Sequence, residues 1–190
     1  MESTSPFLAP MSFERGGLLL RPYRAGDGAE LGQAIQGSHH HLRPWLPWAD
    51  EQYSAERGEE TARRLCAAYL AGTDFTVGIW LDGKLAGGTG FHMRGAPVST
   101  GNSEIGMWIR QDLSGKGLGT RVLEAMLDWG FSEWPWERLE WRCDPRNIAS
   151  ARVAEKCGMK LEGTLRSNMK DVDGERRDTL VYALLKSEWH

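Results

Sequence analysis

The sequence lacks the features that mark secreted and membrane-spanning proteins. It has only three cysteines, which lie far apart and form no Cys-x-x-Cys pair: Cys66, Cys143 and Cys157. An odd number of scattered cysteines argues against a disulfide framework and against a cysteine-based zinc site. The apolar runs are short, Leu18–Leu20 for example, and fall far below the ~20 residues of a membrane-spanning helix.

Positive charge is not in excess either. Lys and Arg number 23 against 26 Asp and Glu, which gives a formal net charge of -3. Binding to nucleic acid through its phosphates usually requires a basic surface. Residues 1–6 contain no basic region and no apolar stretch, so we expect no signal peptide. We therefore expect a cytoplasmic protein that binds neither nucleic acid nor a membrane.

Three consecutive histidines, His39, His40 and His41, resemble a metal-binding tract. Side chains of adjacent residues are expected to diverge, and a zinc ion needs ligands that converge on one point. We therefore expect a cluster of histidines in a loop and no metal site.

What the chain does have is the composition of a globular protein. Hydrophobic residues make up 41% and charged residues 26% of its 190 residues, enough for one domain with its own core. We place that domain at residues 17–190, after a loose lead-in at 1–16. The nine tryptophans suggest aromatic walls as well as core, and an exposed Trp-rich surface could support a homodimer.

Hydrophobic periodicity and turn residues predict a mixed α/β domain. Asp27 and Ser54 are candidate helix N-caps, Gly72 is a stop signal, and Asp82-Gly83 predicts a hairpin. The predicted strands are 18–21, 75–81, 84–92, 103–109, 138–143, 159–169 and 176–185, and the predicted helices start near 28, 55, 118 and 147. This order predicts a largely antiparallel meander followed by β-α-β-α-β-β, with a parallel crossover within residues 103–143.

The most informative segment is the glycine-rich stretch at 112–120, between a strand and an amphipathic helix. Gly115, Gly117 and Gly119 alternate along it. Small residues let successive backbone N–H groups face one concavity, to which a helix N-terminus adds its positive dipole end. The stretch therefore predicts binding of a phosphate or pyrophosphate. It matches neither the Walker A loop nor the Gly-x-Gly-x-x-Gly dinucleotide motif.

Four segments in order carry a resemblance to a known family. Residues 104–109 and 114–119 resemble the acetyl-CoA signature of the GNAT N-acetyltransferases, and 147–150 with 156–159 resemble the ribosomal-protein N-terminal acetyltransferase (RimJ/RimL-like) branch. Residues 43–48 and 161–166 are also similar to that branch. The resemblance implies a GNAT-like fold, with a central mixed, mostly antiparallel sheet flanked by helices and splayed at the acetyl-CoA site.

The resemblance also implies the reaction. Acetyl-CoA is the cosubstrate, no metal is needed, and an amine attacks the thioester directly in a ternary complex. The implied coenzyme-binding residues are Met107, Trp108, Ile109, Ser114, Gly115, Lys116, Gly117, Leu118, Gly119, Thr120 and Asn147. The chain departs from the family pattern at Ser114, where Arg or Gln is usual, and at Met107, where Tyr is common.

Two residues are candidates for proton transfer. Glu104 begins the strand that leads to the loop and is the candidate base, although water could serve and Glu104 could be an exposed strand-end carboxylate. Ser150 matches the family's serine near the coenzyme sulfur, although it could simply occupy the first helical turn. Asn147 could contact the coenzyme or cap its helix. Cys143 and Cys157 are expected to be inert core thiols.

The acceptor amine is left open at this stage. Trp45 and Trp48 could wall an acceptor channel or pack in the core. The favoured acceptor is the N-terminal α-amino group of a protein, such as a ribosomal protein, or of a peptide. A small-molecule amine is the first alternative, and a non-catalytic acyl-CoA-binding module is the second. A cationic acceptor would favour an acidic cleft.

Overall fold

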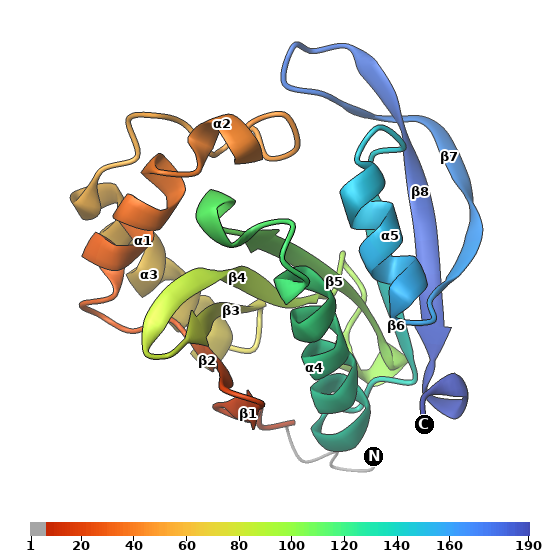
Figure 1. Cartoon of the computed structure of the whole chain (residues 1–190). Coiled ribbons are helices and arrows are strands. Elements are labelled where there is room, and N and C mark those ends of the chain that lie inside the picture. The colour runs from red at the N-terminus through yellow and green to blue at the C-terminus, as the bar shows by residue number, and fades with distance from the viewer. Residues whose placement is uncertain (1–6) are drawn as a thin grey trace.

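The computed structural model describes residues 7–190. The first six residues of the expected lead-in, on which the signal-peptide prediction was made, lie outside the described part. The strands of the described chain form one sheet in the order β1-β2-β3-β4-β5-β6-β8-β7 (Figure 1). Their bounds are β1 Phe13–Arg15, β2 Leu18–Pro22, β3 Phe75–Leu81, β4 Lys84–His92, β5 Asn102–Ile109, β6 Arg138–Cys143, β7 Lys160–Lys170 and β8 Arg176–Leu185. Among the described strands only β5 and β6 pair in parallel, so the predicted mixed, mostly antiparallel sheet is confirmed.

Five helices flank this sheet in the described residues. They are α1 Gly28–Gln36, α2 His39–Leu42, α3 Ala55–Leu70, α4 Leu118–Glu133 and α5 Ile148–Lys156. Short 3-10 turns occur at Val98–Thr100, Gln111–Leu113 and Lys186–Glu188. In Figure 1, α1 and α3 pack together beside the first strands, and α4 and α5 lie on the side of the later ones. No helix within residues 7–190 has both the length and the apolar character needed to cross a membrane.

Two of the three candidate helix caps, Ser54 and Asn147, cap their helices with a side-chain hydrogen bond, and Asp27 does not. The Ser54 hydroxyl accepts a hydrogen bond from the Arg57 amide, and the predicted cap of α3 is confirmed. Asp27 precedes α1 but makes no capping hydrogen bond with its side chain. Its carboxylate instead accepts hydrogen bonds from the Arg24 amide and the Arg21 guanidinium, so the predicted mechanism of that cap is wrong.

Two local predictions are corrected. The segment expected to be a loose lead-in contains β1, because the Gly16-Gly17 turn adopts positive φ at both residues and returns the chain as a hairpin against β2. The histidine cluster forms the single-turn helix α2 and not a loop. The rings of His39 and His40 lie 3.8 Å apart between centroids and do not diverge.

The core has two parts, one on each face of the sheet. On β2, the side chains of Leu18 and Leu20 point to the larger cluster, which α4 covers, and Leu19 points to the smaller cluster under α1 and α3. Five tryptophans are buried in these clusters: Trp80, Trp129, Trp134, Trp136 and Trp141. Among the nine tryptophans only Trp48 is strongly exposed, at 41%. The exposed Trp-rich surface suggested as a basis for a homodimer is therefore not found.

The sheet opens at its centre. β5 and β6 pair at three positions only, from Asn102–Arg138 to Glu104–Glu140. Both strands continue beyond these pairs, β5 to Ile109 and β6 to Cys143. The backbone edges of the two strands therefore separate after Glu104, which is the splay that the fold prediction included.

Candidate active site

The glycine-rich loop lies at the open end of β5 and leads into α4. Gly115 and Gly117 have φ of +72° and +82°, and open space lies where a side chain would stand at either residue. The first helical hydrogen bond of α4 runs from the Arg121 amide to the Gly117 carbonyl. The amides that precede it have no partner within the helix. The loop thus offers a row of N–H groups at a helix N-terminus, an arrangement that suits a phosphate.

Three polar side chains of the loop donate hydrogen bonds to backbone carbonyls. The Lys116 ammonium donates to the Asp112 carbonyl oxygen at 2.8 Å, and the Ser114 hydroxyl donates to the Gln111 carbonyl at 2.8 Å. The Arg121 guanidinium binds the carbonyl of Gly16. These contacts fix the shape of the loop, so the backbone provides most of its donors for an anion.

A cavity of about 710 Å³ lies between α1, α3 and the β4–β5 pair. Met107 and Trp108 line it from β5, and Trp48 lines it from the loop after α2. The Trp48 and Trp108 rings meet edge to face at 6.2 Å between centroids. Trp45, predicted beside Trp48, is half-buried and is not a lining residue. The cavity therefore contacts β5 where that strand has left β6.

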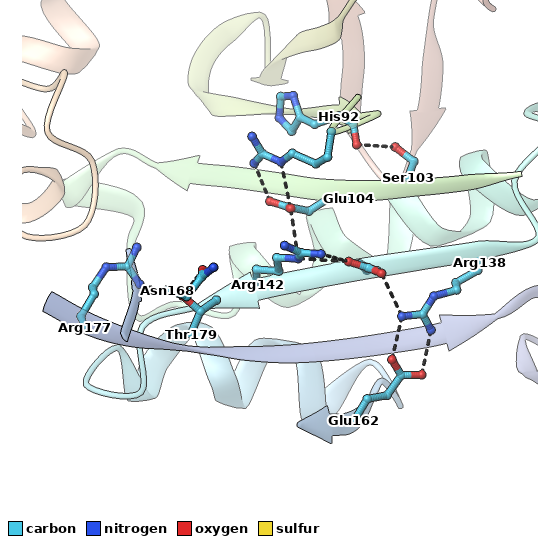
Figure 2. A network of polar contacts seen from close by, with 11 residues as sticks. His92, Ser103, Glu104, Arg138, Arg142, Glu162, Asn168, Arg177 and Thr179 are labelled. Atoms are coloured by element: carbon cyan, nitrogen blue, oxygen red, sulfur yellow. Dashed lines mark hydrogen bonds and ion pairs between the residues drawn. The ribbon is translucent and has the colours of Figure 1, made fainter. Parts of the chain in front are cut away.

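Glu104 is the last residue of β5 that pairs with β6, and its side chain lies in a network of charged groups (Figure 2). Its two oxygens accept hydrogen bonds from Nε and Nη2 of Arg94 at 2.9 and 2.6 Å, and Arg142 lies 3.4 Å away. Arg142 in turn binds Glu140. The Glu104 carboxylate is buried and is not among the residues that line the cavity. The assignment of Glu104 as the base stays a prediction, and the structure shows its lone pairs engaged by two guanidinium groups.

Ser150 lies at the start of α5, facing β6. Its oxygen accepts a hydrogen bond from the Trp141 indole N–H at 3.0 Å. Its amide donates to the Asn147 side chain at 3.1 Å, which confirms Asn147 as the N-cap. Because the indole N–H occupies a lone pair, the Ser150 hydroxyl hydrogen can donate, either to the neighbouring Cys143 sulfur or to a bound ligand.

The two buried cysteines have the properties of protonated thiols. Burial raises the pKa of Cys143, and the hydrogen bond from Ser150 offsets only part of that increase. Burial raises the pKa of Cys157 to about 12. A thiol with a raised pKa is a poor nucleophile at neutral pH. Within residues 7–190, no three or more His, Cys, Asp or Glu side chains are grouped to hold a metal ion.

Sequence reasoning missed part of this site. His92 and Arg94 line the cavity from the end of β4, Tyr23 follows β2, and Arg57 and Arg64 come from α3. No motif marks these residues, because they belong to elements that are distant in sequence.

In this site, β5 separates from β6 beside a backbone phosphate cradle, and a cavity lies against the same strand. This arrangement suits a group-transfer enzyme that brings two substrates together. The profile of the Acetyltransferase (GNAT) domain family matches residues 17–160. The chain belongs to this family and is an acyltransferase.

Individual relatives agree with this assignment. The chain is 29% identical over 175 residues to the Bacillus subtilis protein named "Putative ribosomal N-acetyltransferase YdaF", covering 90% of this chain and 93% of the relative. It is 28% identical to Mycobacterium smegmatis RimJ in complex with CoA-disulfide, with a TM-score of 0.79 over 90% of this chain and 83% of the other. The structure of RimL, the ribosomal L7/L12 α-N-protein acetyltransferase, in complex with coenzyme A superposes with a TM-score of 0.82 at 20% identity. This match covers 92% of this chain and 97% of the other and shows the fold alone.

Proposed function

We propose that the protein transfers an acetyl group from acetyl-CoA to the N-terminal α-amino group of a protein or peptide, within a ternary complex. One observation carries the proposal: Gly106, Met107 and Trp108 line the large cavity and also belong to the part of β5 that has left β6. An amine bound in the cavity and a thioester bound in the splay would therefore meet at the same strand.

The residues of the splay fit a CoA thioester. The loop 114–120 would hold the pyrophosphate through its backbone amides, and Asn147 and Ser150 would border the pantetheine end. The backbone N–H groups of Met107, Trp108 and Ile109 lie on the strand that we expect to polarise the thioester carbonyl. In the reaction the amine nitrogen bonds to the acetyl carbon, the C–S bond breaks, one proton leaves the amine and one is added to the CoA sulfur.

The Gly117→Val variant tests the cradle. A β-branched side chain at φ +82° would strain the loop and fill the open space in front of it. We expect the dissociation constant for acetyl-CoA, measured by isothermal titration calorimetry, to rise about tenfold, the equivalent of one lost charge-assisted hydrogen bond. Gly174→Val is the matched control, since Gly174 also has positive φ and open space but lies in the β7–β8 turn. Equal affinities in the two folded variants would rule out this pyrophosphate site.

The charge of the cavity bears on the acceptor. Its charged lining consists of Arg57, Arg64 and Arg94 against Glu60. Arg57 is paired with Asp50 and Arg94 with Glu104, whereas Arg64 has no ion pair among the described residues. With Arg57 and Arg94 neutralised by their partners, Arg64 and Glu60 leave the lining without the acidic excess that would attract a polyamine. A peptide N-terminus followed by neutral or acidic residues is the better match, and this favours the protein acceptor over the polycationic small molecules.

Charge reversal at Arg64 tests this preference. Arg64→Glu is expected to raise KM about fivefold for an N-terminal peptide with an acidic residue at its second or third position, as for the loss of a partly exposed ion pair worth ~1 kcal/mol. KM for the same peptide with lysine there should fall. Arg63→Glu is the control, because Arg63 is the neighbouring arginine on α3 but pairs with Glu59 outside the cavity. If Arg64→Glu and Arg63→Glu gave the same ratio of KM for the acidic peptide to KM for the lysine peptide, the acceptor would not bind against Arg64.

The direct experiment is a thiol-release screen with acetyl-CoA. N-terminal peptides, amino sugars and polyamines are supplied in turn, and the acetylated product is identified by mass spectrometry. The proposal expects turnover with peptides acetylated at the α-amino group. Turnover only with a small amine would replace the acceptor, and acetyl-CoA binding without turnover on any amine would contradict the transfer function.

A further inference from the structure

We propose that His92 is a catalytic residue that accepts the proton from the attacking amine, and that Asp74 is the positioning residue that holds its ring. This inference rests on the proposed function and adds a residue that no motif indicated. His92 closes β4, Asp74 directly precedes β3, and the two lie just beyond the Phe75–Phe91 pair of the hairpin.

One ring nitrogen of His92 is hydrogen-bonded, and the other is available. Nδ1 lies 3.0 Å from Oδ2 of Asp74, which favours the tautomer with hydrogen on Nδ1. Burial acts to raise the pKa of Asp74, but the hydrogen bonds from His92 and Thr76 outweigh it, so the pKa lies below its ordinary value and the group is a carboxylate. Nε2 has no hydrogen-bond partner within the described residues and can accept a proton.

Nε2 of His92 lies beside β5, the strand at which we expect the reaction. A Cβ atom added to Gly106 would stand 2.8 Å from Nε2 and 3.1 Å from Cδ2 of His92, so this edge of the ring lies against that glycine and a side chain there would displace it. Gly106 lies one residue before Met107, at the separated edge of β5. His92 also lines the acceptor cavity with Met107 and Trp108. The same imidazole therefore contacts both the cavity for the amine and the strand proposed to hold the thioester.

Glu104 is opposite His92 in the β4–β5 register and shares its face of the sheet. The two guanidinium groups on the Glu104 carboxylate leave it poorly suited to take a proton. The charged groups that contact the imidazole, pair beside it or line the same cavity are Asp74 just before β3, Arg94 after β4, Glu104 from β5, and Arg57, Glu60 and Arg64 from α3. Asp74 is the one that touches the ring, so it sets the tautomer.

The test uses the full chain and the peptide that the screen identifies as acceptor. His92→Gln retains a group that can bind Asp74 but cannot accept a proton at neutral pH. We expect its kcat to fall about 100-fold, the low end of the range for general bases, with Kd for acetyl-CoA unchanged within about twofold. His92→Ala should fall similarly and regain activity with added imidazole. Asp74→Asn should lower kcat without changing that Kd. His190→Gln, an exposed histidine at the C-terminus, is the control.

The pH profile separates a catalytic from a structural role. The amine and the imidazole must both be neutral, so kcat/KM of the native enzyme should fall on the acidic side with two ionisations. His92→Gln should retain only the ionisation of the peptide amine. A folded His92→Gln variant with near-native kcat and an unchanged profile, or no imidazole rescue of His92→Ala, would overturn the proposal while the transfer function stands. No thiol release by the native enzyme with any amine would overturn both.

Discussion

Replacing Ser150 with alanine is expected to lower kcat by at least about tenfold and to leave the affinity for acetyl-CoA nearly unchanged. General acid catalysis contributes about 10²–10⁴-fold in enzymes, and a thiolate is a stable leaving group, so the low end of that range or just below it applies. The indole of Trp141 donates to the Ser150 oxygen and so directs the hydroxyl hydrogen away from itself. That hydrogen is the one we assign to the departing CoA sulfur.

A purely structural role for Ser150 makes a different prediction. Alanine is a better helix former than serine by a few tenths of a kcal/mol, while the Trp141 indole would lose its acceptor, at a cost of about 1–3 kcal/mol if no water replaces it. The thermal midpoint would then change and kcat would not. Ser132→Ala is the control, since that hydroxyl also lies on a helix but bonds to the Asp128 carbonyl on α4. A kcat within twofold of the native value, with chemistry shown to be rate-limiting, would rule out proton donation by Ser150.

Most of the fold could be predicted because its signals are local. The Asp82-Gly83 turn has positive φ at both residues, as a two-residue hairpin requires. The bounds of β6 are the predicted ones, and Asn147 caps α5. The position of β8 between β6 and β7 has no local signal, because it depends on which strand edge is unpaired when the C-terminal hairpin packs. The histidine helix was missed because a single turn has too few residues to show a period.

Only the part of the candidate site that a sequence motif marks could be predicted. The phosphate cradle follows from alternating glycines before a helix. The His92–Asp74 contact does not follow from the hairpin, because a regular hairpin around Asp82-Gly83 would put Phe91 opposite Asp74. The irregularity between Ile79 and Trp80 shifts the register by one residue, and His92 takes that place. A β-bulge of this kind depends on packing across the sheet and leaves no mark in the turn sequence.

The close packing of α1 against α3 predicts a loss of stability when Gly58 is replaced with alanine. A Cβ added to Gly58 would lie 2.1 Å from the Gly28 carbonyl oxygen, and one added to Gly28 would lie 2.3 Å from the Glu59 Cα. Both obstacles are backbone atoms, which cannot rotate away. Gly58→Ala gains about 1 kcal/mol of helix propensity, but the clash must separate the helices, and overpacking of this kind typically costs 1–3 kcal/mol and occasionally more. The clash at 2.1 Å is severe, so we expect a net loss of about 2 kcal/mol in the free energy of unfolding.

The same displacement should have a selective effect on the reaction. α1 and α3 supply one wall of the acceptor cavity, including Leu31, Ile35 and Thr61. The side-chain hydrogen bonds of the loop 114–120 run to the carbonyls of Gln111, Asp112 and Gly16 and not to these helices. Gly58→Ala should therefore raise KM for the peptide and leave Kd for acetyl-CoA unchanged. Urea unfolding and the thiol-release assay measure the two effects. Gly119→Ala is the control for stability, because its Cβ would meet only the Val153 methyl group at 3.5 Å. A glycine of a helix with room for a methyl group should gain stability on this change. If Gly58→Ala also became more stable than the native chain, the α1–α3 contact would be looser than the structure shows and would not define the cavity wall.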